Sequence, residues 1–248
     1  MRIGSRPFRH GSRMKIGPKG TWTPLVLSSS LIAWWDASRS DLITQAGGVV
    51  SSWRDIVGGY AAIQATGAAQ PAYSATGFNG FPVISGDGVD DELTFAPLPA
   101  GFPTGATACE EWYLVDQKSL VADTTTRTIG SYGGAVTRSL RRLVTTGVNR
   151  AQTSDSGSTV SHGTADFSNR HVVRLIATGT QVNIEVDGVV GVVASQVSAT
   201  STSRLRFFAG SGTSAAAFAL AGISERVITL PLSATNAALM LAYLSRRL

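Results

Sequence analysis

The chain has 248 residues and a formal net charge of +5, and charged residues make up only 15% of it. Residues 1–19 hold six of the 21 cations and none of the 16 acids, so the remaining residues hold 15 cations and 16 acids, a net charge of −1. A near-neutral body behind a basic N-terminal segment is unlike an evenly basic nucleic-acid-binding domain. We therefore expect no nucleic acid partner for the body.

Composition excludes several further classes of protein. Hydrophobic residues make up 43% of the chain, which is enough for a core and excludes a disordered polymer. No apolar run approaches the ~20 residues of a membrane helix, so we expect no membrane insertion. The basic N-terminus lacks the apolar stretch of a secretory signal, which predicts synthesis in a cytoplasm. A single cysteine, Cys109, makes no intrachain disulfide and indicates no metal cluster.

Residues 1–20 are predicted to form an extended basic arm, and residues 21–248 the folded domain. Four glycines, two prolines and six cations leave the arm little to bury. Three interpretations of the arm are open: a solvated tail, a nucleic-acid contact, or an anchor on an acidic protein surface. Its cations could neutralise phosphates, but only Phe8 precedes Trp22, so stacking on bases is poorly supported. We favour an anchor on another protein, made by Arg2, Arg6, Arg9, Arg13, Lys15 and Lys19.

The body is predicted to be all-β. Residues 21–230 are rich in Val, Thr, Ser, Ala and Gly, with turn signals roughly every 8–12 residues, a spacing typical of a sandwich or barrel. Residues 182–186 alternate between apolar and polar, and Asp187-Gly188 is a strong signal for a tight hairpin. Residues 170–194 are therefore expected to form a three-stranded antiparallel meander.

One helix is expected, at the C-terminus, over residues 233–247. Ser233 is a suitable N-cap, and Arg246 and Arg247 fall where the helix dipole favours cations. One apolar stripe predicts that the helix packs on the sandwich; it consists of Ala237, Met240, Leu241, Leu244 and Leu248.

Three tryptophans are candidate glycan-binding residues. If residues 31–36 form a strand, Trp34 and Trp35 point to opposite faces of the sheet. One of them then belongs to the core, and the other either stacks on a sugar ring or is covered by another segment. Trp53 follows in a second such segment. The alternative is that all three are core aromatics.

Residues 86–92 form the densest acidic stretch. Asp87, Asp90 and Asp91 are weak candidates for binding Ca²⁺, although their spacing does not match an EF-hand loop. The alternative is an Asp-Gly turn that hydrogen-bonds its own backbone. No other cofactor is expected.

Signals for catalysis are sparse. The three histidines are scattered, and the Gly-x-Ser-x-Gly elbow of serine hydrolases is missing from the sequence. Glu185 and Asp187 have the parity of paired glycosidase carboxylates on one strand, but the hairpin turn explains Asp187 better. We therefore expect that the protein is not an enzyme, with a carbohydrate-active hydrolase as the alternative.

A series of short motifs runs through the chain, and their order is the basis of a resemblance to a known family of domains. Their residues are 33–38, 50–55, 58–62, 64–65, 71–73, 79–83 and 87–91, followed by 186–188, 218–225, 232–233 and 243–247. With these motifs the chain resembles the concanavalin A-like, laminin-G-like jelly-roll domains of many phage virion proteins. The resemblance covers about residues 25–248, and it is loose over 96–168.

The resemblance implies an antiparallel jelly-roll β-sandwich with one C-terminal helix. It also implies a structural or adhesion component of a phage-like virion, made in the bacterial cytoplasm and displayed for host-surface glycan binding or subunit contacts. Capsid or tail proteins would hold the arm, and a homo-oligomer or symmetric array is expected. Related glycanases carry a Glu-x-Asp-x-Glu-like strand that this chain lacks, which favours binding over hydrolysis. The family's aromatic residue before Asp-Gly is replaced by Gly86, which predicts looser packing under that turn.

Overall fold

The fold is described from a computed structural model of the chain. The described residues are 22–103, 107–117, 127–133, 137–145, 148–155, 158–162, 169–191, 193–195, 204–209, 219 and 221–248. The predicted arm and the domain boundary at residue 20 lie outside them, so both stay predictions. Across the described residues, no helix combines the length and the apolar character that crossing a bilayer requires.

The elements are almost all strands. The 3₁₀ turns are η1 (Pro24–Ser30), η2 (Ser40–Leu42) and η3 (Gly67–Ala69). The strands in the first half are β1 (Leu31–Asp36), β2 (Ile43–Ala46), β3 (Val49–Arg54), β4 (Ala61–Ile63), β5 (Ala72–Phe78), β6 (Phe81–Ser85), β7 (Leu93–Phe95) and β8 (Cys109–Gln117). Those in the second half are β9 (Arg127–Gly133), β10 (Thr137–Thr145), β11 (Val148–Asp155), β12 (Ser158–Ser161), β13 (Arg170–Ala177), β14 (Gln181–Val186), β15 (Val189–Val190), β16 (Ala194–Ser195), β17 (Leu205–Phe207) and β18 (Ala221–Thr229). One α-helix, α1 (Ala234–Ser245), ends the chain.

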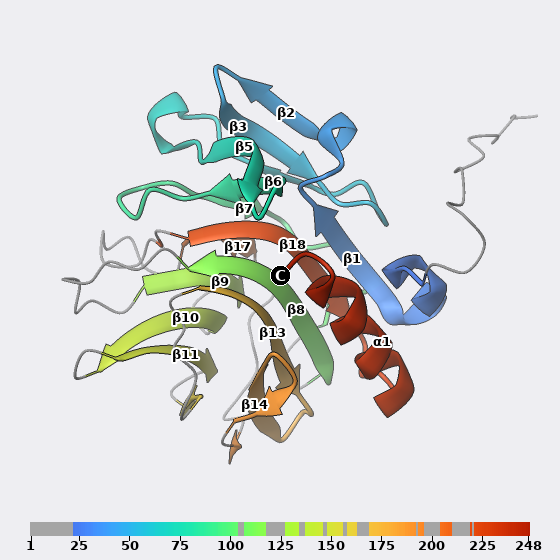
Figure 1. The fold of residues 1–248 in the computed structure, drawn as a ribbon. Helices are drawn as coiled ribbons and strands as arrows, with labels where there is room; N and C mark the ends of the chain where they lie inside the picture. The colour runs from blue at the N-terminus through green and yellow to red at the C-terminus, as the bar shows by residue number, and fades with distance from the viewer. Residues whose placement is uncertain are drawn as a thin grey trace, which may run out of the picture.

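Two antiparallel layers make a sandwich. The main layer has the order β1–β18–β8–β13–β14. The second layer has the order β2–β3–β4–β7–β17–β9–β10–β11–β12. The β5–β6 hairpin joins the two, since β6 pairs with β18 and β5 with β3. The predicted all-β antiparallel sandwich with one C-terminal helix is confirmed (Figure 1).

Alternation along the main layer divides its side chains between two apolar clusters. Trp35 and Tyr113 point into the core between the layers, which also holds Phe207 from β17. Their neighbours Trp34 and Trp112 point the other way and pack with Met240 of α1, which lies across this face (Figure 1). Because both faces of the main layer are covered, all nine residues of β18 are buried.

The predicted helix and meander are both confirmed. The Ser233 hydroxyl accepts a hydrogen bond from the amide of Asn236 at 3.2 Å, as an N-cap does. Of the apolar stripe, Ala237, Met240 and Leu244 are buried and Leu241 is partly buried. Leu248 lies beyond the helix and is 40% exposed. Asp187 and Gly188 join β14 to β15 with φ of 51° and 80°, the positive values that a type I′ hairpin requires.

The expectation of loose packing at Gly86 is wrong. A Cβ atom at this position would lie 2.7 Å from the carbonyl oxygen of Ala219 and 3.0 Å from the Cβ of Phe208. Phe208 is fully buried, so an aromatic side chain from a distant segment packs against this turn.

Candidate functional site

The three tryptophans predicted to contact glycans are buried, with Trp34 5% exposed and Trp35 and Trp53 0% exposed. Trp34 lies under α1, where its ring meets Tyr243 edge to face at 6.0 Å and its Nε1 donates to Glu225 at 2.9 Å. Trp35 and Trp53 both pack against Phe207 in the core. The expected opposite orientation of Trp34 and Trp35 is confirmed, but their expected role in stacking on a sugar is wrong because helix and core cover them.

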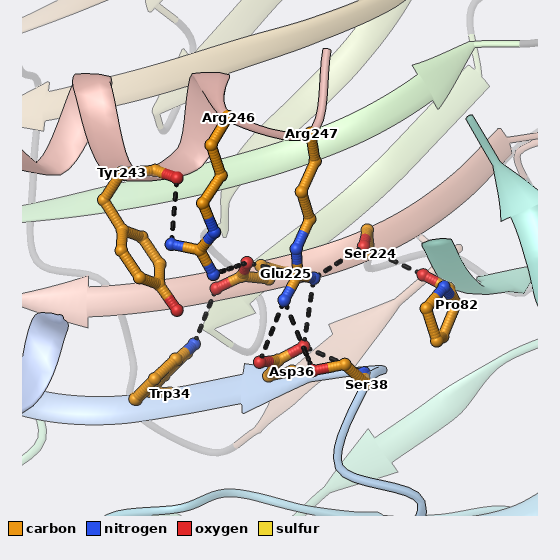
Figure 2. Close-up of polar contacts among 9 residues, drawn as sticks. All are labelled: Trp34, Asp36, Ser38, Pro82, Ser224, Glu225, Tyr243, Arg246 and Arg247. Atoms are coloured by element: carbon orange, nitrogen blue, oxygen red, sulfur yellow. Dashed lines mark hydrogen bonds and ion pairs between the residues drawn. The ribbon is translucent and has the colours of Figure 1, made fainter. Parts of the chain in front are cut away.

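Two carboxylates and an arginine form a buried cluster at the C-terminal end of α1 (Figure 2). Asp36 and Glu225 are register partners on β1 and β18. Nη1 of Arg247 lies 3.1 Å from Oδ1 of Asp36 and 3.0 Å from Oε1 of Glu225. The Glu225 contact is close but is not a hydrogen bond, since Oε1 has no hydrogen-bond partner. We call Asp36, Glu225 and Arg247 the latch.

Glu225 of the latch lies in an environment that disfavours its charged form. Burial, with the charge of Asp36 beside it, raises the pKa of Glu225 to about 8, even though Arg247 and Arg246 lower it. Glu225 therefore holds its proton at neutral pH. A buried carboxyl group with a raised pKa is typical of a general acid. Arg247 is only 4% exposed, however, so a substrate does not reach this pair. The latch is a structural cluster that holds the residues after α1 against strands β1 and β18.

A second cluster on the same face reaches solvent. Arg174 on β13 donates to Glu110 on β8 at 2.7 and 3.0 Å, and to Glu185 on β14 at 3.0 and 3.2 Å. Its guanidinium lies 4.8 Å from the ring centroid of Trp112. The side chains of Arg174 and Glu185 are 14% and 16% exposed, whereas Glu110 is 2% exposed. Two carboxylates thus flank one arginine at the edge of the main layer.

Asp187, which the sequence places as a possible second acid beside Glu185, does not join this cluster. Its carboxylate accepts the amide of Val172 at 2.8 Å and lies 2.7 Å from Nδ1 of His171. The explanation of Asp187 as a hairpin residue is confirmed. Glu110, not Asp187, is the acid that faces Glu185 across Arg174.

A third acid–arginine pair lies inside the sandwich. Arg226 donates to Glu111 at 2.7 Å, with side-chain exposures of 0% and 3%. The guanidinium lies between Tyr113 and Phe207, 4.8 and 5.0 Å from their ring centroids, and the Tyr113 hydroxyl donates to Glu111 at 2.8 Å. The sequence contains a signal for these pairs, because charges within apolar strands such as 110–115 and 223–228 are rarely buried without partners. It does not show which charges meet.

The acidic turn at residues 86–92 has features of both predicted alternatives, a Ca²⁺ site and a turn that hydrogen-bonds its own backbone. Carboxylate oxygens of Asp87, Asp90 and Asp91 lie within 4.8 Å of one another. The turn also bonds its own backbone, since Asp91 accepts the amide of Asp87 at 2.9 Å and Asp87 accepts that of Val89 at 2.8 Å. Arg127 donates to the carbonyl of Gly88 at 2.6 Å. Backbone bonding accounts for the turn without a metal, and Ca²⁺ binding stays a prediction.

Replacing Asp91 by asparagine is expected to raise the melting temperature at pH 7. Burial, together with the charge of Asp87, raises the pKa of Asp91 to about 6 from an ordinary value of 3.8. The native state therefore holds the proton more tightly than the unfolded state, and stability falls as pH rises from about 4 to 6. Asparagine keeps the acceptor for the amide of Asp87 and removes this loss. The stabilisation should fade by pH 4 in thermal melts recorded across the range.

Asp41→Asn is the matched control for this experiment. The hydrogen bond from exposed Arg39 lowers the pKa of Asp41, so its removal should slightly lower the melting temperature at pH 7 and have no effect near pH 3. Equal effects of D91N at pH 4 and pH 7 would contradict the account of the turn. If Ca²⁺ binds there, adding it should stabilise wild type but not D91N.

Comparisons with known proteins place the fold. No protein-family model matches the sequence, and no curated protein matches it significantly. Among solved structures, a Trypanosoma rangeli sialidase in complex with 2,3-difluorosialic acid is 14% identical with a TM-score of 0.62, covering 94% of this chain and 35% of the sialidase. Domain 4 of AbnA, a GH43 extracellular arabinanase from Geobacillus stearothermophilus, is 10% identical with a TM-score of 0.55. That match covers 88% of this chain and 98% of the domain.

An arabinofuranosidase complexed with arabinofuranosyl-α-1,2-xylobiose is also similar, at 10% identity, a TM-score of 0.55 and coverage of 88% of this chain and 58% of that one. The chain spans about a third of the sialidase. Likeness at these identities establishes the shared fold, a β-sandwich found in carbohydrate-active proteins.

These neighbours correct one expectation and leave another without support. The expectation that the protein is not an enzyme is contradicted by these structural neighbours. The sialidase, the arabinanase and the arabinofuranosidase are glycoside hydrolases. The virion, capsid and tail context gains no support from them. The anchoring cations of residues 1–20 lie outside the described residues. Anchoring by the arm and homo-oligomer formation stay predictions.

Proposed function

We propose that this chain is the β-sandwich of a carbohydrate-active protein and that it binds glycans. The observation that carries the proposal is the match to the arabinanase domain, which covers 98% of that domain and 88% of this chain. That domain was solved in complex with arabinotriose. A sandwich of this extent that holds an oligosaccharide supports the same role here.

Titration of the full chain by calorimetry against a panel of oligosaccharides tests glycan binding. The panel contains arabinotriose, an arabinofuranosyl-xylobiose, 3′-sialyllactose and trigalacturonate, which cover neutral and acidic sugars. Saturable binding of at least one of them is expected. Lack of binding to every sugar by a chain with a cooperative thermal melt would refute the proposal.

Glycoside hydrolysis is the second candidate function. The solved neighbours are hydrolases, and Glu110 and Glu185 bond the same guanidinium, Arg174. Glycosidases use two carboxyl groups placed across the scissile bond. The partly exposed Glu185 is the acid of this pair that a substrate reaches.

A reducing-sugar assay on the same panel tests this second function. Release of product that falls at least 100-fold in Glu185→Gln, with the melting temperature kept within a few degrees, would establish a role in the chemistry. Glutamine keeps an acceptor for Arg174, and Asp41→Asn serves as the surface control. Equal release by wild type and E185Q would exclude Glu185, and no release from any sugar would exclude hydrolysis of the panel.

A further inference from the structure

Buried acids of the main layer hold helix α1 at both of its ends. Before the helix starts, the amide of Leu232 donates to Glu110 of β8 at 3.0 Å. After it ends, Arg247 donates to Asp36 of β1 at 3.1 and 3.3 Å (Figure 2). Between these points one face of the helix is buried, with Ala237, Met240, Tyr243 and Leu244. The helix therefore depends on polar contacts at its ends in addition to one apolar face.

The latch at the second of these ends holds two carboxyl groups but one buried guanidinium. Both Nη atoms of Arg247 donate to Asp36, and Nη1 lies 3.0 Å from Oε1 of Glu225 without a hydrogen bond. The hydrogen bond that Glu225 accepts comes from the neutral indole of Trp34, at 2.9 Å. Glu225 is 0% exposed. An ionised Glu225 would lie buried beside a second carboxylate, and no charged donor of the described residues bonds it, which favours the protonated form.

The other groups around Glu225 do not reverse this preference. Among the described residues, those that face it on β1 and after β18 are Trp34, Asp36, Tyr243, Arg246 and Arg247, and Leu114 lies opposite it on β8. Arg246 is 38% exposed, lies 3.7 Å from Glu225 and donates to the carbonyl of Tyr243. Burial and the charge of Glu225 raise the pKa of Tyr243, so its hydroxyl stays neutral. Burial and the charge of Asp36 outweigh both arginines and raise the pKa of Glu225 to about 8.

The proton on Glu225 couples the latch to pH. If the residues after α1 leave β1 and β18, Glu225 meets water and its pKa returns towards the ordinary value of 4.5. The closed latch therefore holds a proton that the open latch gives up between about pH 4.5 and pH 8. Because opening releases a proton in this range, it becomes more favourable as pH rises, by up to about tenfold per pH unit, and it levels off above the range.

The connection between β18 and α1 is suited to act as a hinge. Leu230, Pro231 and Ser233 in this connection are exposed. An element that packs through one face and follows an exposed connection opens more readily than the strands at the centre of a sheet. Opening would uncover the apolar residues of the main layer that pack with α1, which include Trp34, Trp112 and Val227.

We propose that residues 234–248 form a pH-sensitive strap, which is closed on the main layer while Glu225 carries a proton and is released as Glu225 becomes ionised. The strap is a regulatory device, separate from glycan binding, that controls exposure of the apolar face around Trp34. Its direction is release at alkaline pH and closure at mildly acidic pH.

Hydrogen–deuterium exchange of the full chain from about pH 5 to about pH 9 tests the proposal. Dividing the exchange rates of α1 amides by their intrinsic rates at each pH gives the opening constant of the strap. In wild type this constant should rise up to about tenfold per pH unit from pH 5 to pH 7.5 and level off above about pH 8.5. In Glu225→Gln it should be independent of pH, because glutamine is neutral throughout and keeps an acceptor for Trp34.

Two further variants serve as controls. Asp41→Asn, which changes an exposed acid distant in sequence from the latch, should retain the pH profile of wild type. Met240→Ala removes a fully buried side chain from the apolar face of α1, so it should raise the opening constant by a similar factor at every pH. The effect of charge is thereby separated from a general loosening of the helix.

His171 provides the alternative source of pH dependence. Its Nδ1 lies 2.7 Å from Asp187, and a Cβ atom at the adjacent Gly188 would lie 2.7 Å from Leu241 of α1. Histidine is the side chain whose charge ordinarily changes in this pH range. The same slope in wild type and E225Q would therefore exclude Glu225 as the sensor and overturn the proposal.

Wild type alone also decides between the strap and a rigid helix. If amides of α1 open with the same constant as those of β8 and β18, the helix opens only by global unfolding, and there is no strap. An opening constant that stays level or falls between pH 5 and pH 7.5 would overturn the proposal as well, whether or not E225Q folds.

Discussion

Replacing Arg247 by methionine is expected to lower the free energy of unfolding by about 3–5 kcal/mol, the typical cost of removing one partner from a buried ion pair. Its guanidinium bonds Asp36 at 3.1 and 3.3 Å and Ser224 at 3.1 Å. Without it, Asp36 stays buried with no cation of the described residues at hydrogen-bond distance. Glu225 adds less to the cost because it already holds a proton at neutral pH. Urea denaturation at pH 7 measures the loss.

Arg246→Met is the matched control, one residue away on the same helix end. Arg246 is 38% exposed and lies 3.7 Å from Glu225, so its electrostatic interaction with that residue is screened by water. Its loss should cost about 1 kcal/mol or less. Similar losses for R246M and R247M would contradict the assignment of the latch to Arg247.

Arg226→Met is the second substitution with a large expected effect, again about 3–5 kcal/mol. It leaves the Glu111 carboxylate in the core, where, within the described part of the chain, the Tyr113 hydroxyl is the remaining donor to it. The double variant E111Q/R226M should recover most of this loss, because glutamine is neutral and keeps an acceptor for Tyr113. Unfolding curves of the two variants and of wild type give the comparison.

The recovery is the informative part of this prediction. A double variant as unstable as R226M would mean that packing of Arg226 between Tyr113 and Phe207, and not its charge, dominates. E111Q alone should also be destabilised, since it leaves the Arg226 cation buried beside a neutral partner.

Features that depend on neighbouring residues could be predicted from the sequence. Strand alternation identifies the opposite faces of Trp34 and Trp35, Asp187-Gly188 identifies the hairpin, and Ser233 identifies the start of α1. Each follows from local backbone preference or periodicity, which a few consecutive residues express in full.

Features that depend on residues distant in the sequence could not be predicted in this way. Arg247 suits the end of a helix dipole, yet it contacts Asp36, 211 residues earlier in the chain. Only Arg246 behaves as local rules predict, donating to the carbonyl of Tyr243 at 3.0 Å. Sequence alone makes Trp34 a candidate for sugar stacking, because an outer face is expected to meet solvent. The sequence predicts that the helix packs on the sandwich, but not that it covers this residue.

The candidate sites show the same limit. Glu185 is recognisable as a candidate acid, but its partners Arg174 and Glu110 come from two other strands.

Hydrogen–deuterium exchange of the full chain with and without each sugar of the panel tests the central claim, that the β-sandwich binds a glycan, most directly. The account predicts that at least one sugar at saturating concentration slows exchange in a group of neighbouring strands. Exchange unchanged by every sugar at saturating concentration would contradict it.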